Sequence, residues 1–110
     1  MTGQLSSKKC VPCEIGTPPL TAEEIKPLKD QLKLDWEVIE GKKLKREFKF
    51  KTFMEAINFV NKIAKIAEEE GHHPDIYIYY NRVVISLMTH NIRGLSENDF
   101  ILAAKIEDLS

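Results

Sequence analysis

The feature that most constrains this chain is a long amphipathic stretch in its middle, which runs from Thr52 to Gly71. Apolar residues recur there every three or four positions, the spacing of one face of an α-helix. Thr52 is a good N-cap, and Gly71 is a typical helix stop. The pattern predicts a helix that ends near Glu70 and buries one apolar stripe, made of Phe53, Ala56, Ile57, Phe59, Val60, Ile63, Ala64, Ile66 and Ala67.

A pair of strand patterns stands on each side of this helix. Residues 36–40 and 43–50 enclose a Gly41-Lys42 turn, and residues 75–80 and 83–88 enclose an Asn81-Arg82 turn. Shorter helical patterns begin at the N-caps Thr21 and Ser96. The order α-β-β-α-β-β-α predicts a two-layer α+β domain, with a four-stranded antiparallel sheet covered by helices on one face. The second strand pair is apolar on both faces, which predicts burial of the open face by self-association.

Composition and charge limit the class of protein. A chain of 110 residues with 43% apolar and 30% charged residues is long enough for one core. We expect a flexible N-terminal extension over residues 1–20 and a single domain over residues 21–110. With 16 Lys and Arg against 17 Asp and Glu, the chain lacks the basic excess of a nonspecific nucleic-acid binder. It has no apolar run long enough for a membrane span and no apolar signal core in Met1–Lys9, so we expect a cytoplasmic protein.

All three histidines fall in one short region, as His72, His73 and His90. If Asn81 and Arg82 form the turn, Tyr80 pairs with Val83, and the same register places His73 opposite His90. Imidazole groups exchange protons near neutral pH, so such a cluster predicts acid–base chemistry. Solvated histidines at strand ends are the simpler interpretation.

Two further questions stay open: whether the histidines bind a metal, and what role Trp36 has. Three histidines can hold zinc, and Cys10 and Cys13 add a C-x-x-C pair that could complete a structural zinc site. Trp36, at the start of a strand, fits a core or interface position better than a substrate platform.

Several motifs together resemble the pterin-4a-carbinolamine dehydratase family. They are Glu70-Gly-His-His-Pro-Asp75, Tyr80-Asn-Arg-Val83, Thr89-His90 and Gly94-Leu-Ser-Glu-Asn-Asp99, together with Trp36, Glu40-Gly41 and Phe48-x-Phe50. The resemblance covers about residues 21–110. It implies an α+β domain that assembles as a homodimer or homotetramer, with a small-molecule pterin as its substrate and no metal or organic cofactor.

The resemblance also implies an activity and a set of site residues. The reaction is dehydration of 4a-hydroxytetrahydropterin to quinonoid dihydropterin, as in 4a-hydroxytetrahydrobiopterin dehydratase, in tetrahydropterin recycling. His72, His73 and His90 are the expected catalytic residues, with His72 and His90 as general acids and His73 against the substrate. The expected substrate-binding residues are Glu68, Pro74, Thr89, Asp99 and Trp36. The alternative is a protein-binding dimerisation cofactor or a pterin-binding accessory protein without turnover.

Overall fold

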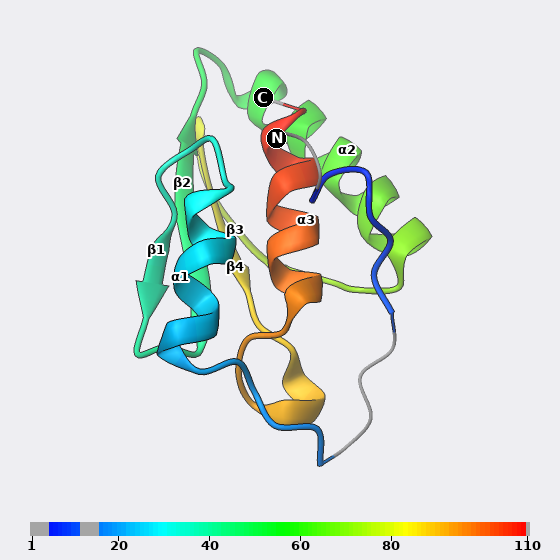
Figure 1. Ribbon diagram of the computed structural model, residues 1–110. Helices are drawn as coiled ribbons and strands as arrows, with labels where there is room; N and C mark the ends of the chain where they lie inside the picture. Colours follow the sequence, from blue (N-terminus) through cyan, green and yellow to red (C-terminus); the bar gives the residue numbers. More distant parts are fainter. Residues whose placement is uncertain (1–4, 12–15, 110) are drawn as a thin grey trace.

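The computed structural model describes residues 5–11 and 16–109 and contains the expected order of elements. These are α1 (Ala22–Asp30), β1 (Glu37–Ile39), β2 (Lys43–Lys49), α2 (Phe53–Glu70), β3 (Asp75–Tyr79), β4 (Arg82–Leu87), the short 3₁₀ helix η1 (His90–Ile92) and α3 (Glu97–Glu107). The strands form one antiparallel sheet in the order β1-β2-β4-β3, and the three α-helices cover one face of it (Figure 1). The predicted two-layer α+β fold is confirmed.

Helix α2 begins and ends where its sequence predicts. The Thr52 hydroxyl accepts a hydrogen bond from the Glu55 backbone N–H at 3.1 Å, and Gly71 ends the helix in the left-handed conformation, with φ of 66°. The buried stripe is narrower than expected, because only Ala56, Phe59, Ile63 and Ala67 are buried. Phe53, which the pattern placed on the buried face, is 47% exposed.

Helix α3 is the centre of the helical layer. It contacts both α1 and α2 and lies between them in Figure 1. Its first turn is held by Asp99, whose Oδ2 accepts a hydrogen bond from the Ser96 backbone N–H at 3.0 Å. Nine of its eleven residues are buried, including the polar Asn98, Asp99 and Glu107, so the helix is enclosed on nearly all sides.

The predicted register of the β3–β4 hairpin is wrong by two residues. The turn consists of Tyr80 and Asn81, and Tyr79 pairs with Arg82. The Asn81 side chain donates a hydrogen bond to the Phe50 carbonyl at 2.9 Å, and the Phe50 N–H donates to the Asn81 carbonyl at 2.8 Å. These bonds tie the turn to the end of β2, so Arg82 joins the ladder, where it also pairs with Lys49. Because the shift is even, each side chain keeps its predicted face.

The N-terminal segment makes more contacts than the sequence predicts for a flexible extension. Leu5 is 2% exposed and belongs to the hydrophobic core. The Leu20 N–H donates to the Leu95 carbonyl at 2.9 Å. Pro19 lies so close to Gly94 that a Cβ added to the glycine would be 2.6 Å from the proline Cβ. The described residues before α1 therefore lie against the domain instead of leading away from it. None of the described helices combines the length and apolar character needed to cross a bilayer.

Candidate functional site

The histidines come together at one cavity of about 360 Å³, although they are not paired across the hairpin. His72 and His73 follow the end of α2, and His90 begins η1 after β4. Eleven residues line the cavity: Cys10, Val11, Glu70, Gly71, His72, His73, Met88, Thr89, His90, Asn91 and Asn98. Its volume falls at the lower end of the range for small-molecule sites.

The predicted pairing of His73 with His90 is wrong because the hairpin has a different register from the predicted one. Paired residues begin at Asp75 and Ser86, so strand pairing ends before either histidine. His90 is instead placed by a tight loop, in which the Thr89 N–H donates to the Gly94 carbonyl at 2.8 Å. Arg93 reverses the chain in the left-handed conformation, with φ of 53°.

The buried carboxylate of Asp99 holds the ring of His72. Its Nε2 lies 2.6 Å from Asp99 Oδ1, and the Asp99 side chain is fully buried. The other oxygen, Oδ2, accepts hydrogen bonds from the Thr89 hydroxyl at 2.8 Å and from the Ser96 N–H at 3.0 Å. The Thr89 oxygen is also 2.7 Å from the Ser96 hydroxyl. This network fixes the ring of His72 through its Nε2 atom.

His73 has a partner at the surface. Its Nε2 lies 2.5 Å from Glu68 Oε2, and the two side chains are 59% and 78% exposed. A pair this exposed is screened by water, so it contributes little to stability and serves mainly to orient the ring.

The cavity includes only some of the residues expected to bind the substrate. Thr89 lines it, whereas Glu68, Pro74 and Asp99 are not among its lining residues. Glu68 and Asp99 instead contact His73 and His72, so both carboxylates act on the site through a histidine.

Glu70 and Cys10 form a second polar contact in the cavity wall. The Cys10 backbone N–H donates to Glu70 Oε1 at 2.8 Å, and this bond is the main cause of the lowered pKa of Glu70. Lys105 lies 3.7 Å from the same carboxylate. Burial raises the pKa of the Cys10 thiol to about 12, and the Glu70 charge adds to the shift. The thiol is therefore uncharged near neutral pH, and its Sγ is 3.6 Å from the Asn98 carbonyl.

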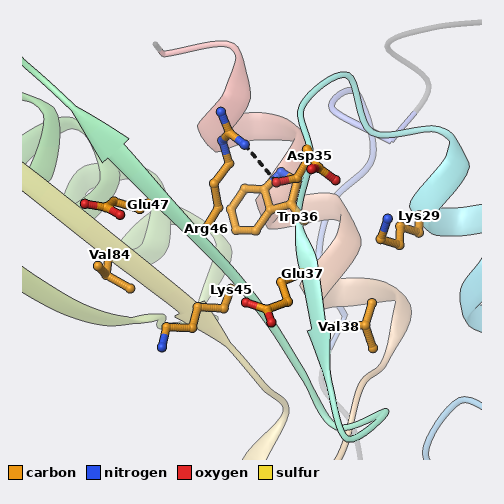
Figure 2. Close-up of a pocket in the computed structure, with 9 residues that line it drawn as sticks. All are labelled: Lys29, Asp35, Trp36, Glu37, Val38, Lys45, Arg46, Glu47 and Val84. Atoms are coloured by element: carbon orange, nitrogen blue, oxygen red, sulfur yellow. Dashed lines mark hydrogen bonds between the residues drawn. The ribbon is translucent and has the colours of Figure 1, made fainter.

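Trp36 lies in the core and not at the histidines. It is 1% exposed, and its indole Nε1 donates to Glu107 Oε2 at 2.8 Å. It touches a larger, open hollow of about 800 Å³ between α1 and the first strands, shown in Figure 2. The charged residues that line this hollow are balanced, with Lys29, Lys45 and Arg46 against Asp35, Glu37 and Glu47. This balance, together with the lack of histidine, gives the hollow no evident chemistry.

The part of the chain that the structure describes contains no ligand cluster that would support the zinc interpretation. No three His, Cys, Asp or Glu side chains within residues 5–11 and 16–109 converge as metal ligands. Cys10 is a free thiol, and Cys13 lies outside the described residues.

Sequence reasoning missed part of the cavity wall. Cys10 and Val11 line the cavity, yet both are more than 55 residues from the histidines in sequence. A local pattern carries no signal for such a contact. The zinc hypothesis grouped Cys10 with the histidines on other grounds, and Leu5, an isolated apolar residue in a polar stretch, anchors the segment in the core.

Comparison with known proteins adds to this geometry. A family model described as pterin 4 alpha carbinolamine dehydratase matches residues 18–109. A protein of Alkaliphilus metalliredigens, provisionally named pterin-4-alpha-carbinolamine dehydratase, is 52% identical over 94% of this chain and 93% of its own length. A protein of Legionella pneumophila with the same provisional name is 50% identical over 99% of this chain and 97% of its own.

Solved structures agree on the fold. A structure from Brucella melitensis, described as a transcriptional coactivator/pterin dehydratase, matches with a TM-score of 0.77 and 35% identity, over 83% of this chain and 97% of that one. A pterin dehydratase-like protein, described as a RuBisCO assembly factor in the alpha-carboxysome, shares the fold at 24% identity and a TM-score of 0.60. The length of the family match and the identity to full-length relatives show that the chain belongs to the pterin-4-alpha-carbinolamine dehydratase family.

Proposed function

We propose that the chain dehydrates 4a-hydroxytetrahydropterin to quinonoid dihydropterin at the cavity formed by His72, His73 and His90. The observation that carries this proposal is the convergence of three imidazoles, from two separate segments, on one cavity of about 360 Å³. The names of the relatives support the same reaction class. The size of the cavity suits a bicyclic pterin, and its polar wall suits the hydrogen-bonding edge of that ring.

The reaction needs one proton delivered and one removed. The C4a–O bond breaks, its electron pair leaves with the oxygen, and a protonated histidine supplies the proton that makes the leaving group water. The adjacent ring nitrogen gives its electron pair to form the new double bond and loses its proton to a neutral histidine. Each such transfer typically accelerates a reaction by about 10²–10⁴-fold.

Within this scheme His72 and His90 are the general acids that serve the leaving oxygen, and His73, which binds the substrate, is the neutral histidine that accepts the ring proton. The contact between His72 and Asp99 supports the assignment of His72, because a ring held at Nε2 offers Nδ1 in a fixed direction. His73 is orientated by Glu68, and His90 belongs to the separate η1 turn. The substrate would thus meet histidines from two segments of the chain.

We further propose that the chain works as a homo-oligomer, with 4a-hydroxytetrahydrobiopterin as substrate in cytoplasmic tetrahydropterin recycling. Support for self-association comes from the exposed aromatic and apolar side chains of edge strand β3 and its turn. Tyr77, Ile78, Tyr79 and Tyr80 are 48%, 39%, 53% and 69% exposed. So much exposed apolar surface in one place is typical of an interface. The alternative protein-binding role has no comparable support at the cavity.

The test is a stopped-flow assay with freshly generated 4a-hydroxytetrahydropterin. We expect the wild type to exceed the spontaneous rate and each of His72→Ala, His73→Ala and His90→Ala to lose most of that acceleration. Asn61→Ala, an exposed change on α2, is the matched control and should match the wild type. A folded wild type that leaves the spontaneous rate unchanged would refute the proposal and favour a binding role.

A further inference from the structure

Residues 5–11, called the N-terminal segment below, contribute Cys10 and Val11 to the wall of the histidine cavity. The proton transfers proposed above give these residues no role. Besides the buried Leu5, the segment is tied to α3 by charged groups. Lys105 Nζ donates to the Ser6 carbonyl at 2.8 Å, and Lys8 pairs with Glu97 at 2.8 Å. The segment lies beside α3 and the end of α2 in Figure 1. It is therefore anchored at several points before it reaches the cavity.

The last described residues of this segment are held by a side-chain clamp. The carboxamide of Asn98 binds both backbone groups of Val11: its Oδ1 accepts from the Val11 N–H at 2.9 Å, and its Nδ2 donates to the Val11 carbonyl at 2.5 Å. One residue earlier, the Cys10 N–H is held by Glu70. Asn98 is 4% exposed, so its hydrogen bonds to Val11 are shielded from water.

Val11 itself combines a fixed backbone with a free side chain. It is 64% exposed, although both its N–H and its carbonyl are hydrogen-bonded. Its neighbours on the cavity wall are mostly polar, including the three histidines. Small-molecule sites combine apolar side chains with a few placed polar groups, and Val11 and Met88 are the apolar side chains that this cavity offers beside its histidines.

We propose that Val11 is a substrate-contacting specificity residue of this cavity and that Asn98 is a positioning residue acting through it. Val11 contacts an apolar face of the bicyclic pterin, while the histidines bind its polar edge and exchange protons. This inference rests on the proposed function. It predicts an effect on substrate binding and not on the chemical step, because Val11 carries no group that can exchange a proton.

The test compares Val11→Ala, Asn98→Ala and the double variant with the wild type. Three quantities are measured: kcat and KM for 4a-hydroxytetrahydropterin, and the Kd of 7,8-dihydropterin, which needs no turnover. Met54→Ala is the matched control, because Met54 is 61% exposed and lies sixteen residues before Glu70 on α2, about 24 Å along the helix. Circular dichroism and thermal unfolding check that each variant is folded.

We expect Val11→Ala to raise KM and Kd about fivefold and to leave kcat within twofold, as loss of a small apolar contact does. Asn98→Ala should raise both constants at least as much. The double variant should be no worse than Asn98→Ala, because two residues that act as one unit are not additive. Met54→Ala should match the wild type.

The contrary results are distinct. Unchanged KM and Kd in Val11→Ala overturn the proposal, and so does a fall in kcat alone. Additive effects in the double variant overturn the positioning role of Asn98. A wild type that binds 7,8-dihydropterin without turnover contradicts only the proposed dehydration, and the Kd comparison still decides the role of Val11.

Discussion

Asp99→Asn is the substitution that separates orientation of His72 from stability of the fold. Asp99 Oδ2 accepts hydrogen bonds from Thr89 and from the Ser96 N–H, and Oδ1 faces His72 Nε2 at 2.6 Å. An asparagine keeps the first two bonds only if its oxygen replaces Oδ2. Its NH₂ group then points at His72 and requires Nε2 to accept, so the proton of the neutral ring moves to Nδ1.

The two consequences differ in size. The fold loses the extra strength of bonds to an ionised acceptor, which amounts to about 1 kcal/mol in the free energy of unfolding. The enzyme loses the tautomer and the ring orientation of His72, and proton delivery from His72 depends on both. We therefore expect kcat to fall about 10²-fold, the lower end of what a positioned acid or base contributes.

The assay is the initial rate of dehydration, with urea unfolding measured on the same protein samples. Asp108→Asn, the same chemical change at the exposed end of α3, is the control and should keep full activity. Because Asp99 acts through His72, adding Asp99→Asn to His72→Ala should cost no further activity. A kcat within threefold of the wild type for Asp99→Asn would refute this account of His72.

Three further predictions concern groups outside the proton-transfer steps. Glu107→Gln should lower the free energy of unfolding by about 2–4 kcal/mol in a urea titration, whereas exposed Glu37→Gln should leave it unchanged. The reason is that the 7% exposed carboxylate of Glu107 accepts bonds from two backbone N–H groups and from the Trp36 indole. Cys10 should react with iodoacetamide at pH 8 about a thousandfold more slowly than an ordinary thiol, since its pKa is raised from 9.0 to about 12; mass spectrometry of the Cys10 peptide measures this, and an ordinary rate contradicts it. The pKa of Glu70 is lowered by folding, so the stability it contributes is present above its unfolded pKa of 4.5 and is lost as pH falls through the lower folded value. Acid unfolding of Glu70→Gln should accordingly show a weaker pH dependence below pH 4.5, and an unchanged curve would contradict the assignment.

The fold could be predicted from sequence because its signals are local. The stripe of α2, the caps at Thr52 and Ser96 and the strand patterns depend on residues within a few positions of each other. The hairpin register could not be predicted in this way. It depends on the bond between the Asn81 side chain and Phe50, which are 31 residues apart.

The sequence predicted that the histidines lie together, but it did not predict how the chain brings them there. The histidines do share a cavity, but they reach it through the end of α2 and the η1 loop, and not through a strand ladder. Trp36 received two different predictions. Its strand position favoured a core or interface residue, which agrees with an indole buried against Glu107, whereas the family resemblance alone suggested a substrate contact. The contacts of residues 5–11 could not be predicted either. Like the hairpin register, they depend on residues that are far apart in the sequence.

The most direct test of the central claim is the dehydration rate of the double variant His72→Ala/His90→Ala, which removes both proposed proton donors and leaves Asp99, His73 and Val11 in place. We expect a folded protein whose dehydration rate equals the spontaneous rate. A double variant that keeps the acceleration of the wild type would show that the protons travel through other groups, and the histidine site would have to be abandoned.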